Sequence, residues 1–341
     1  MDVHSAQVMS PVLGAIALIA LTAAPRPASA QVAGLTGTLV VTNKAPSTAT
    51  IVDVASGRTL ATLPTGQGPH EVVMSSDGRL AVVTDYGGVR GGSTLTVIDV
   101  LRRRVARTID LGQYRRPHGI AFLPGDSLVA VTSEATRNVV IVNVVEGAVR
   151  TAIPTRHEGS HMVGVTADGT RAYTGDIGSN TVSELDVAGG RYLRSWEVPS
   201  EPEAVNVTPD GQDVWVGSNS TGKVSVVDTR RGEVATAAEG FGWPYRILFT
   251  PDTKTVLMPD LRREELRFVE RASHRELGRL TFPGGGPQGI TITPDGRYAF
   301  QSLSREGRVA IIDVSRRAVV GHLSTGPAPD GVAYSTRAPN E

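Results

Sequence analysis

The chain has 341 residues, with 34 basic and 34 acidic side chains and no cysteine. A formal charge of zero argues against nucleic acid as the main partner, because binding to a phosphate backbone requires a basic surface. The lack of cysteine excludes disulfide bonds, a thiolate nucleophile, iron–sulfur clusters and cysteine-ligated zinc.

The first 30 residues are typical of an export signal. Residues 12–24 are almost all apolar, and Ala28-Ser29-Ala30 supplies the small residues of a cleavage site. The apolar stretch is short for a membrane span, although an uncleaved anchor is the alternative. We expect cleavage after Ala30, a periplasmic or secreted product without a membrane span, and one monomeric domain over residues 31–341.

The rest of the chain contains seven copies of one repeat. Each copy has a tetrad similar to Val40–Asn43 (VVTN), and the seven tetrads end at residues 43, 85, 133, 176, 218, 260 and 302. A turn similar to Asp77-Gly78 precedes all but the first tetrad. An apolar run similar to Ile51-Val52-Asp53 follows each tetrad. The interval of 42 to 48 residues is the length of one structural repeat.

Each repeat predicts four short strands, because β-branched apolar runs alternate with turn residues. Four strands in one repeat are typical of a propeller blade, so we predict an all-β, seven-bladed β-propeller with four-stranded antiparallel blades. The first tetrad has no strand before it, whereas residues 330–335 form a strand left over at the C-terminus. We expect this last strand to pair into the first blade and close the ring, which removes an exposed sheet edge.

The VVTN-type tetrad, the apolar third strand ending in Asp and the 42-residue period resemble the YVTN repeat propellers, in particular the periplasmic YncE-like group. The resemblance covers residues 37–335. It implies a seven-bladed fold and agrees with export. It implies no particular reaction, because propellers of this broad class include lactonases, metal-dependent lyases, haem-carrying proteins and proteins without demonstrated chemistry.

In a propeller the first strand of each blade lines the central channel. The residue at the start of that strand therefore recurs, once per blade, around one mouth of the channel. In chain order these residues are His70, His118, His161, Glu203, Tyr245, Gln288 and Asp330. The three histidines and Glu203 come from successive blades, and their side chains are suitable ligands for Zn, Cu, Fe or Mn. We therefore expect His70, His118, His161 and Glu203 to bind a divalent or transition metal ion. The alternative is a set of hydrogen-bonded polar residues that gene duplication copied from blade to blade.

The opposite wall of the mouth would carry Tyr245, Arg246 and Asp330. Polar groups that face an open coordination position are typical of a catalytic metal site, with Tyr245 or Asp330 as acid or base. The tetrad ends Asp85, Asp176 and Asp260 either orient the ligating histidines or form turns.

Several other polar residues have simpler interpretations. The third-strand aspartates, such as Asp53, are expected to cap turns, and His274 and His322 to lie on the surface. The glycine-rich segment 86–93 is either a lid over the mouth or a tolerated insertion. His157 is a reserve ligand.

Two functions fit this pattern. The first is an exported metal-dependent enzyme that acts on a small molecule, with lactone hydrolysis or a lyase elimination suggested by analogy alone. The second is a non-catalytic propeller scaffold that binds a protein, peptide or glycan of the cell envelope on the same face.

Overall fold

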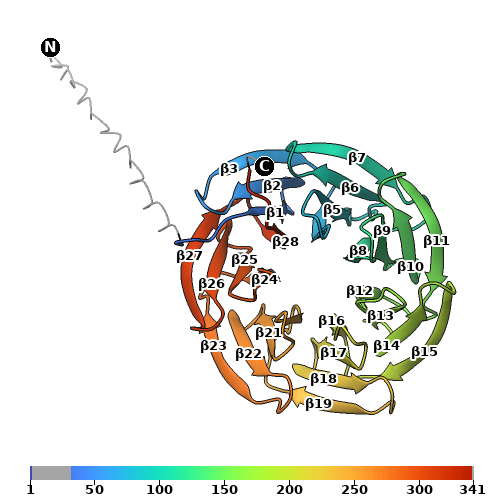
Figure 1. Cartoon of the computed structure of the whole chain (residues 1–341). Coiled ribbons are helices and arrows are strands. Elements are labelled where there is room, and N and C mark those ends of the chain that lie inside the picture. Colours follow the sequence, from blue (N-terminus) through green and yellow to red (C-terminus); the bar gives the residue numbers. More distant parts are fainter. Residues whose placement is uncertain (2–31, 340–341) are drawn as a thin grey trace.

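We describe the chain from a computed structural model, whose described residues are Met1 and residues 32–339. The predicted export signal lies outside these residues. The described part forms seven four-stranded antiparallel sheets, which surround a central opening as the blades of a propeller (Figure 1). The predicted fold class is therefore confirmed. No helix in residues 32–339 has the length and apolar character needed to cross a membrane.

The first blade contains the strand from the C-terminus. Blade one consists of β28 (Pro329–Ser335), β1 (Thr38–Asn43), β2 (Thr48–Asp53) and β3 (Thr59–Pro64). β28 pairs antiparallel with β1, with Leu39 opposite Tyr334 and Val40 opposite Ala333. The predicted ring closure is confirmed, and β1 has no exposed edge.

The other blades use consecutive strands, ordered from the channel to the rim (Figure 1). Blade two consists of β4 (Pro69–Met74), β5 (Leu80–Asp85), β6 (Thr94–Asp99) and β7 (Arg104–Asp110). Blade three consists of β8 (Pro117–Phe122), β9 (Leu128–Ser133), β10 (Asn138–Asn143) and β11 (Ala148–Pro154). Blade four consists of β12 (Ser160–Val165), β13 (Arg171–Asp176), β14 (Thr181–Asp186) and β15 (Arg191–Glu197).

The last three blades follow the same plan. Blade five consists of β16 (Pro202–Val207), β17 (Asp213–Ser218), β18 (Lys223–Asp228) and β19 (Val234–Ala238). Blade six consists of β20 (Leu248–Phe249), β21 (Thr255–Asp260), β22 (Glu265–Glu270) and β23 (Glu276–Thr281). Blade seven consists of β24 (Pro287–Ile292), β25 (Tyr298–Leu303), β26 (Arg308–Asp313) and β27 (Ala318–Ser324).

The inner strand of blade six is much shorter than its counterparts. β20 has two residues, and before it only an isolated bridge joins Pro244 to Asp260. The neighbouring strand β21 contains Pro259, which has no N–H to donate to a ladder. Tyr245 and Arg246 therefore lie in irregular backbone, although the Tyr245 N–H still bonds the Pro259 carbonyl.

The hydrophobic core lies between adjacent blades. One buried cluster, for example, joins Val82 and Leu95 of blade two to Val129 and Val140 of blade three. The two middle strands of a blade pack against neighbouring blades on both faces, which explains why they are near-continuous apolar runs. The outer strands are largely exposed. This packing holds the inner strands in fixed positions around the channel.

Candidate functional site at the channel mouth

The predicted site residues of blades two to five lie in β-bulges at the start of the inner strands. In blade two, Pro69 pairs with Asp85 and Val72 with Val83, so the pairing skips His70 and Glu71. The pairing is irregular at the corresponding place in blades three, four and five. A bulge turns side chains away from the regular strand alternation. The repeat therefore places polar side chains at the mouth without disturbing the apolar strands below.

The tetrad threonines hold these bulges in place. The Thr84 hydroxyl accepts the Glu71 N–H at 3.0 Å, so that this N–H is not left unsatisfied. Thr132 donates to the His161 carbonyl of the next blade at 2.6 Å, and Thr42 donates to the His70 carbonyl at 2.9 Å. The tetrad thus fixes the backbone that carries the histidines.

A glycine allows two of the histidines to meet. A Cβ atom on Gly119 would lie 2.6 Å from the Met162 Cα of the next blade. Only glycine therefore permits the inner strands of blades three and four to approach this closely. The rings of His118 and His161, which neighbour these positions, have centroids 3.7 Å apart.

The three predicted histidines form one cluster. The centroids of His70 and His118 are 4.9 Å apart, and Tyr86 stacks on His70 at 4.5 Å. Burial lowers the pKa of His70 to about 4, despite the opposing charge of Asp330. Burial, followed by the positive charge of the nearby His161, lowers the pKa of His118 well below its usual value. Both rings are therefore neutral near pH 7, with lone pairs available.

His161 differs from the other two histidines because it lies between two carboxylates. Its Nδ1 is 3.0 Å from Glu134 Oε2, and its Nε2 is 3.6 Å from Glu203 Oε1. Burial lowers the pKa of His161, but the hydrogen bond with Glu134 and the negative charge of the nearby Glu203 outweigh burial and raise it to about 9. Glu203 also accepts hydrogen bonds from Asn219 and, at 3.0 Å, from Trp243 Nε1.

The residues predicted for the opposite wall are buried and bonded to each other. The Tyr245 hydroxyl donates to Asp330 Oδ1 at 3.2 Å, and Lys44 Nζ lies 2.8 Å from Asp330 Oδ2. Burial and the charge of Asp330 raise the pKa of Tyr245 well above its usual value. Burial raises the pKa of Asp330, but the positive charge of Lys44 outweighs it and lowers the pKa.

Arg246 links the two walls. Its guanidinium forms a buried ion pair with Glu71, lies 3.9 Å from Glu203 and covers the Tyr245 ring at 4.1 Å. Burial lowers the pKa of Arg246, but the charge of Glu71 outweighs it and raises the pKa. Burial also raises the pKa of Glu71, against the charge of Arg246. We describe Glu71 as ionised, because a buried guanidinium without a counter-ion would be far costlier.

A preformed metal cage is absent from the described residues. Within residues 32–339, no three His, Asp or Glu side chains are already placed to hold a metal ion. One observation nevertheless fits a cation. Nδ1 of His118 is buried and has no hydrogen-bond partner among the described residues. An unpartnered buried polar atom is rare in proteins and often marks an absent water or ion.

The sequence prediction missed a second ring of residues, which lies one position beyond the tetrads. Among these residues, Lys44 pairs with Asp330, Tyr86 donates to Glu134 at 3.2 Å, Glu134 contacts His161, and Asn219 donates to Glu203. The signal that could have found them is their shared position, since each comes directly after the last residue of a tetrad.

Of the two alternatives for the tetrad aspartates, the structure supports a role in binding loops and neighbouring strands rather than in orienting the histidines. Asp85 accepts hydrogen bonds from Thr94 and Thr96 of the next strand, and Asp176 accepts them from Thr181 and Ser183. Asp260 accepts four backbone N–H bonds, those of residues 242, 243, 262 and 263. These carboxylates tie loops and strands together.

The remaining polar residues have structural roles. The third-strand aspartates cap turns as predicted, since Asp53, for example, accepts the Ala55 N–H at 3.1 Å. His157 contacts Tyr192, 6.0 Å away between ring centroids. His274 and His322 are partly buried rather than fully exposed.

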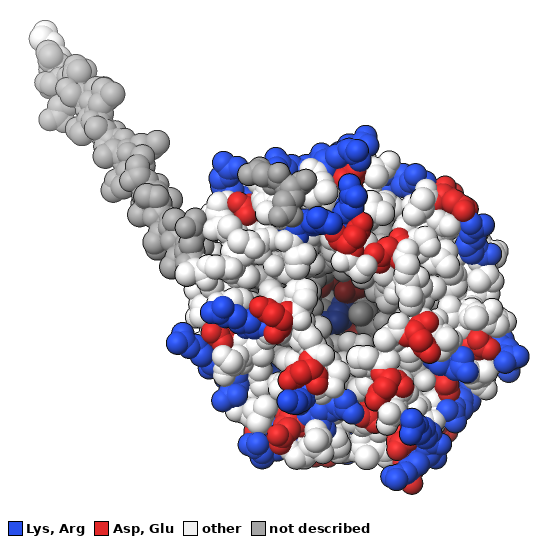
Figure 2. Space-filling view, viewed as in Figure 1, with Lys and Arg blue, Asp and Glu red and all other residues white. Residues whose placement is uncertain are grey.

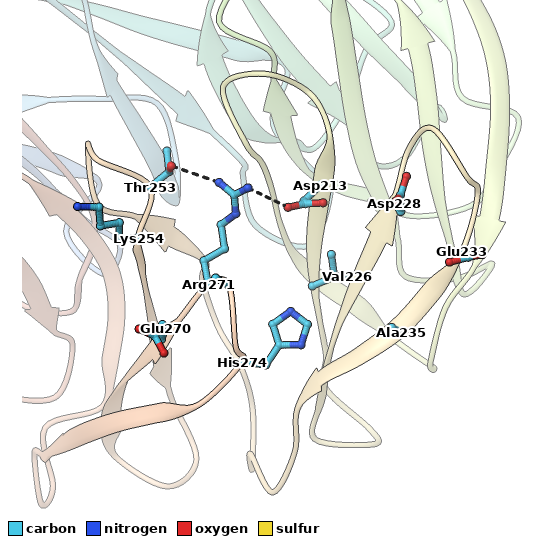
Figure 3. Close-up of a pocket in the computed structure, with 11 residues that line it drawn as sticks. Asp213, Val226, Asp228, Glu233, Ala235, Thr253, Lys254, Glu270, Arg271 and His274 are labelled. Carbon is cyan, nitrogen blue, oxygen red and sulfur yellow. Dashed lines mark hydrogen bonds and ion pairs between the residues drawn. The ribbon is translucent and has the colours of Figure 1, made fainter.

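His274 packs against the buried Trp215 at 5.4 Å and lines a pocket of about 570 Å³ between blades five and six. Figure 3 shows Arg271 in this pocket, bonded to Asp213 and Thr253. Arg271 and Asp213 are the ion pair formed within this lining, whereas Asp228, Lys254 and Glu270 pair with residues outside it.

Comparisons with known proteins identify the fold. No family model and no curated protein matches the chain. Hydrazine synthase of Kuenenia stuttgartiensis superposes with a TM-score of 0.71 at 19% identity, over 82% of this chain and 93% of that chain. A functionally unknown protein from Desulfotomaculum acetoxidans DSM 771 superposes with a TM-score of 0.73 at 15% identity, over 88% of this chain and 99% of that chain. At these identities the likeness shows the fold alone, a seven-bladed β-propeller.

Proposed function

We propose that this chain is an exported propeller of the YVTN repeat type, and that its channel mouth binds a divalent transition metal ion used on a small-molecule substrate. His70, His118, His161 and Glu203 would hold the ion. The observation that carries the proposal is the contact of three imidazole rings from consecutive blades, of which His118 has a buried nitrogen that bonds to none of residues 32–339. Neutral imidazoles are good ligands for Zn and related ions.

The charges around the cluster also favour a cation. Four carboxylates, three permanent cations and one protonated histidine meet here: Glu71, Glu134, Glu203 and Asp330; Lys44, Arg116 and Arg246; and His161. Carboxylates withdrawn from water need positive partners, and without His161 the four carboxylates outnumber the three permanent cations. In the metal-free chain the His161 proton supplies the additional positive charge between Glu134 and Glu203. A bound ion would supply positive charge at the same place.

The opposite wall is suited to binding and polarising a substrate. The raised pKa of Tyr245 and the lowered pKa of Asp330 make both poor at exchanging protons near pH 7. We therefore assign Tyr245 and Asp330 to holding each other in place, since the Tyr245 hydroxyl donates its hydrogen bond to Asp330, and Arg246 to stabilising negative charge that develops on the substrate. The ion would act as a Lewis acid on a carbonyl or activate a water, which suits a hydrolase or a lyase.

Calorimetric titration of the metal-free full chain with Zn²⁺ and with Mn²⁺ tests this proposal. We expect one equivalent of at least one of these ions to bind. His118→Ala should weaken metal binding by more than the roughly 10- to 100-fold that is typical when a residue hydrogen-bonded to a metal ligand is replaced. His322→Ala, a matched change in the outer strand β27, should leave binding unaltered. Failure of the wild-type chain to bind either ion would overturn the proposal and favour the scaffold that binds an envelope component.

A further inference from the structure

Five arginines gather on blade two, at the ends of the strands that face away from the channel mouth. They come from the turn between β4 and β5, from the turn that leads into β7, and from the segment after β28. The Val100 N–H bonds the Arg79 carbonyl at 2.9 Å, and Arg337 Nε donates to the Asp77 carbonyl at 3.0 Å, so the three segments are in contact. In Figure 2 basic side chains gather over β6 and β7. We call this surface the arginine cluster, and its members are Arg79, Arg102, Arg103, Arg104 and Arg337.

The arginine cluster departs from the pattern of the repeat. The turn between the third and fourth strands has a glycine with positive φ in four blades, at Gly57, Gly147, Gly190 and Gly232. Blade two has Arg103 at this position, with a φ of +52°. A residue with a side chain is strained in this left-handed conformation. Such strain is typical of positions where the side chain itself has a function.

The carboxylates beside the arginine cluster do not neutralise it. Asp99 pairs with Arg102 at 2.9 Å, and within residues 32–339 no other member of the cluster is in an ion pair. Arg103 donates to the Pro339 carbonyl at 2.7 Å, which carries no charge. The carboxylates nearby are three, and they also accept hydrogen bonds from turn residues: Asp77, Asp99 and Asp126. Five arginines against three carboxylates leave an excess of two positive charges.

This excess favours a ligand with several negative groups. Linked phosphates carry about one negative charge each, so two or more in a row match it. Guanidinium groups bind phosphate through paired hydrogen bonds, and clusters of arginine are a common means of recognising it. Residues 75–79, 100–104 and 336–339 contain no aromatic side chain on which a nucleic acid base could stack. We propose that the arginine cluster binds a linear polymer of linked phosphate groups without bases.

The rest of this face does not suit a membrane surface. The turns equivalent to Asp77-Gly78 in blades four to seven carry exposed carboxylates, at Asp168, Asp210, Asp252 and Asp295. A flat anionic bilayer laid on the face would bring its lipid phosphates close to these carboxylates, which would repel them. A narrow polymer chain can contact blade two alone.

Fluorescence anisotropy of labelled inorganic polyphosphate, titrated with the full chain, tests the proposal. A chelator is present throughout, so the result is independent of the metal site on the other face. We expect saturable binding that weakens as the salt concentration rises, because counterion release drives it. Absence of binding would overturn the proposal. So would displacement of the probe by phosphatidylglycerol vesicles or oligothymidylate at a lower phosphate concentration than unlabelled polyphosphate requires, in favour of a membrane or a nucleic acid.

Replacement of Arg103 by Gly separates binding from folding. It restores the glycine of the other blades and relieves the left-handed backbone, so the melting temperature should not fall. Affinity for polyphosphate should fall about fivefold, and about a hundredfold when Arg79→Gln and Arg104→Gln are added. Arg317→Gly is the matched control, because Arg317 has a φ of +49° at the same turn position in blade seven. It should leave the affinity unchanged. Equal affinities of Arg103→Gly and wild type, or equal losses in Arg103→Gly and Arg317→Gly, would refute the assignment.

Discussion

Replacement of Asp85 by Asn should change how the stability of the propeller depends on pH. Asp85 is buried at the end of β5 and accepts hydrogen bonds from the hydroxyls of Thr94 and Thr96. Burial raises its pKa from 3.8 to about 6, against the effect of these hydrogen bonds. In blade one the same position is Asn43, whose amide donates to Thr48 and Thr50. Asparagine is therefore compatible with this site.

The expected magnitude follows from the two pKa values of Asp85. The folded chain holds the proton more tightly than the unfolded chain, so ionisation destabilises the fold. This destabilisation is absent below pH 3.8, grows as the pH rises, and is complete above pH 6. At about 1.36 kcal/mol per pH unit it reaches about 3 kcal/mol. Asp85→Asn, which cannot ionise, should gain stability relative to wild type by up to this amount between pH 3.5 and pH 7.

Urea unfolding followed by circular dichroism measures the effect. The difference in the free energy of unfolding between Asp85→Asn and wild type should increase with pH through this range. Asn43→Asp should show the opposite trend, because it introduces a buried carboxylate at the equivalent position. A difference that stays constant with pH in both variants would refute the argument that burial controls this carboxylate.

Three further predictions concern the ring, the inner strands and the site. Ending the chain before Pro329 removes β28 and should abolish the single cooperative transition in calorimetry, whereas an intact transition would show that ring closure is dispensable. Gly119→Ala should lower the free energy of unfolding by about 1–3 kcal/mol, because its Cβ would meet Met162 at 2.6 Å. Gly88→Ala is the matched control, because its Cβ would meet the flexible end of the Gln67 side chain rather than backbone; equal effects in the two variants would contradict the argument from close approach. Glu134→Ala should weaken metal binding about 10- to 100-fold through its contact with His161, and unchanged affinity would remove Glu134 from the site.

The repeat pattern was sufficient to predict the architecture. Seven tetrads at a period near 42 residues and the unpaired strand at residues 330–335 determined the number of blades and the closure of the ring. The equivalent positions also brought His70, His118 and His161 into contact, because a ring converts equal spacing along the chain into proximity.

The details of the site depend on features that a repeat does not encode. Glu134 lies in the turn after β9, at a position that holds Lys44, Tyr86 and Asn219 in other blades, so the repeat does not indicate its contact with His161. The pairing of Glu71 with Arg246 joins residues 175 positions apart and depends on the bulge in blade two and on the irregular backbone in blade six. The protonation states also depend on the tertiary structure. Although the three histidines occupy equivalent positions, the pKa values of His70 and His118 are lowered and that of His161 is raised.

Diffraction from zinc-soaked crystals, collected at the zinc absorption edge, tests the cation site most directly. We predict an anomalous peak at the channel mouth, about 2.0–2.1 Å from a ring nitrogen of His118 and adjacent to His70. A map with no peak beside the three imidazole rings, in crystals whose surface sites do bind zinc, would contradict the account.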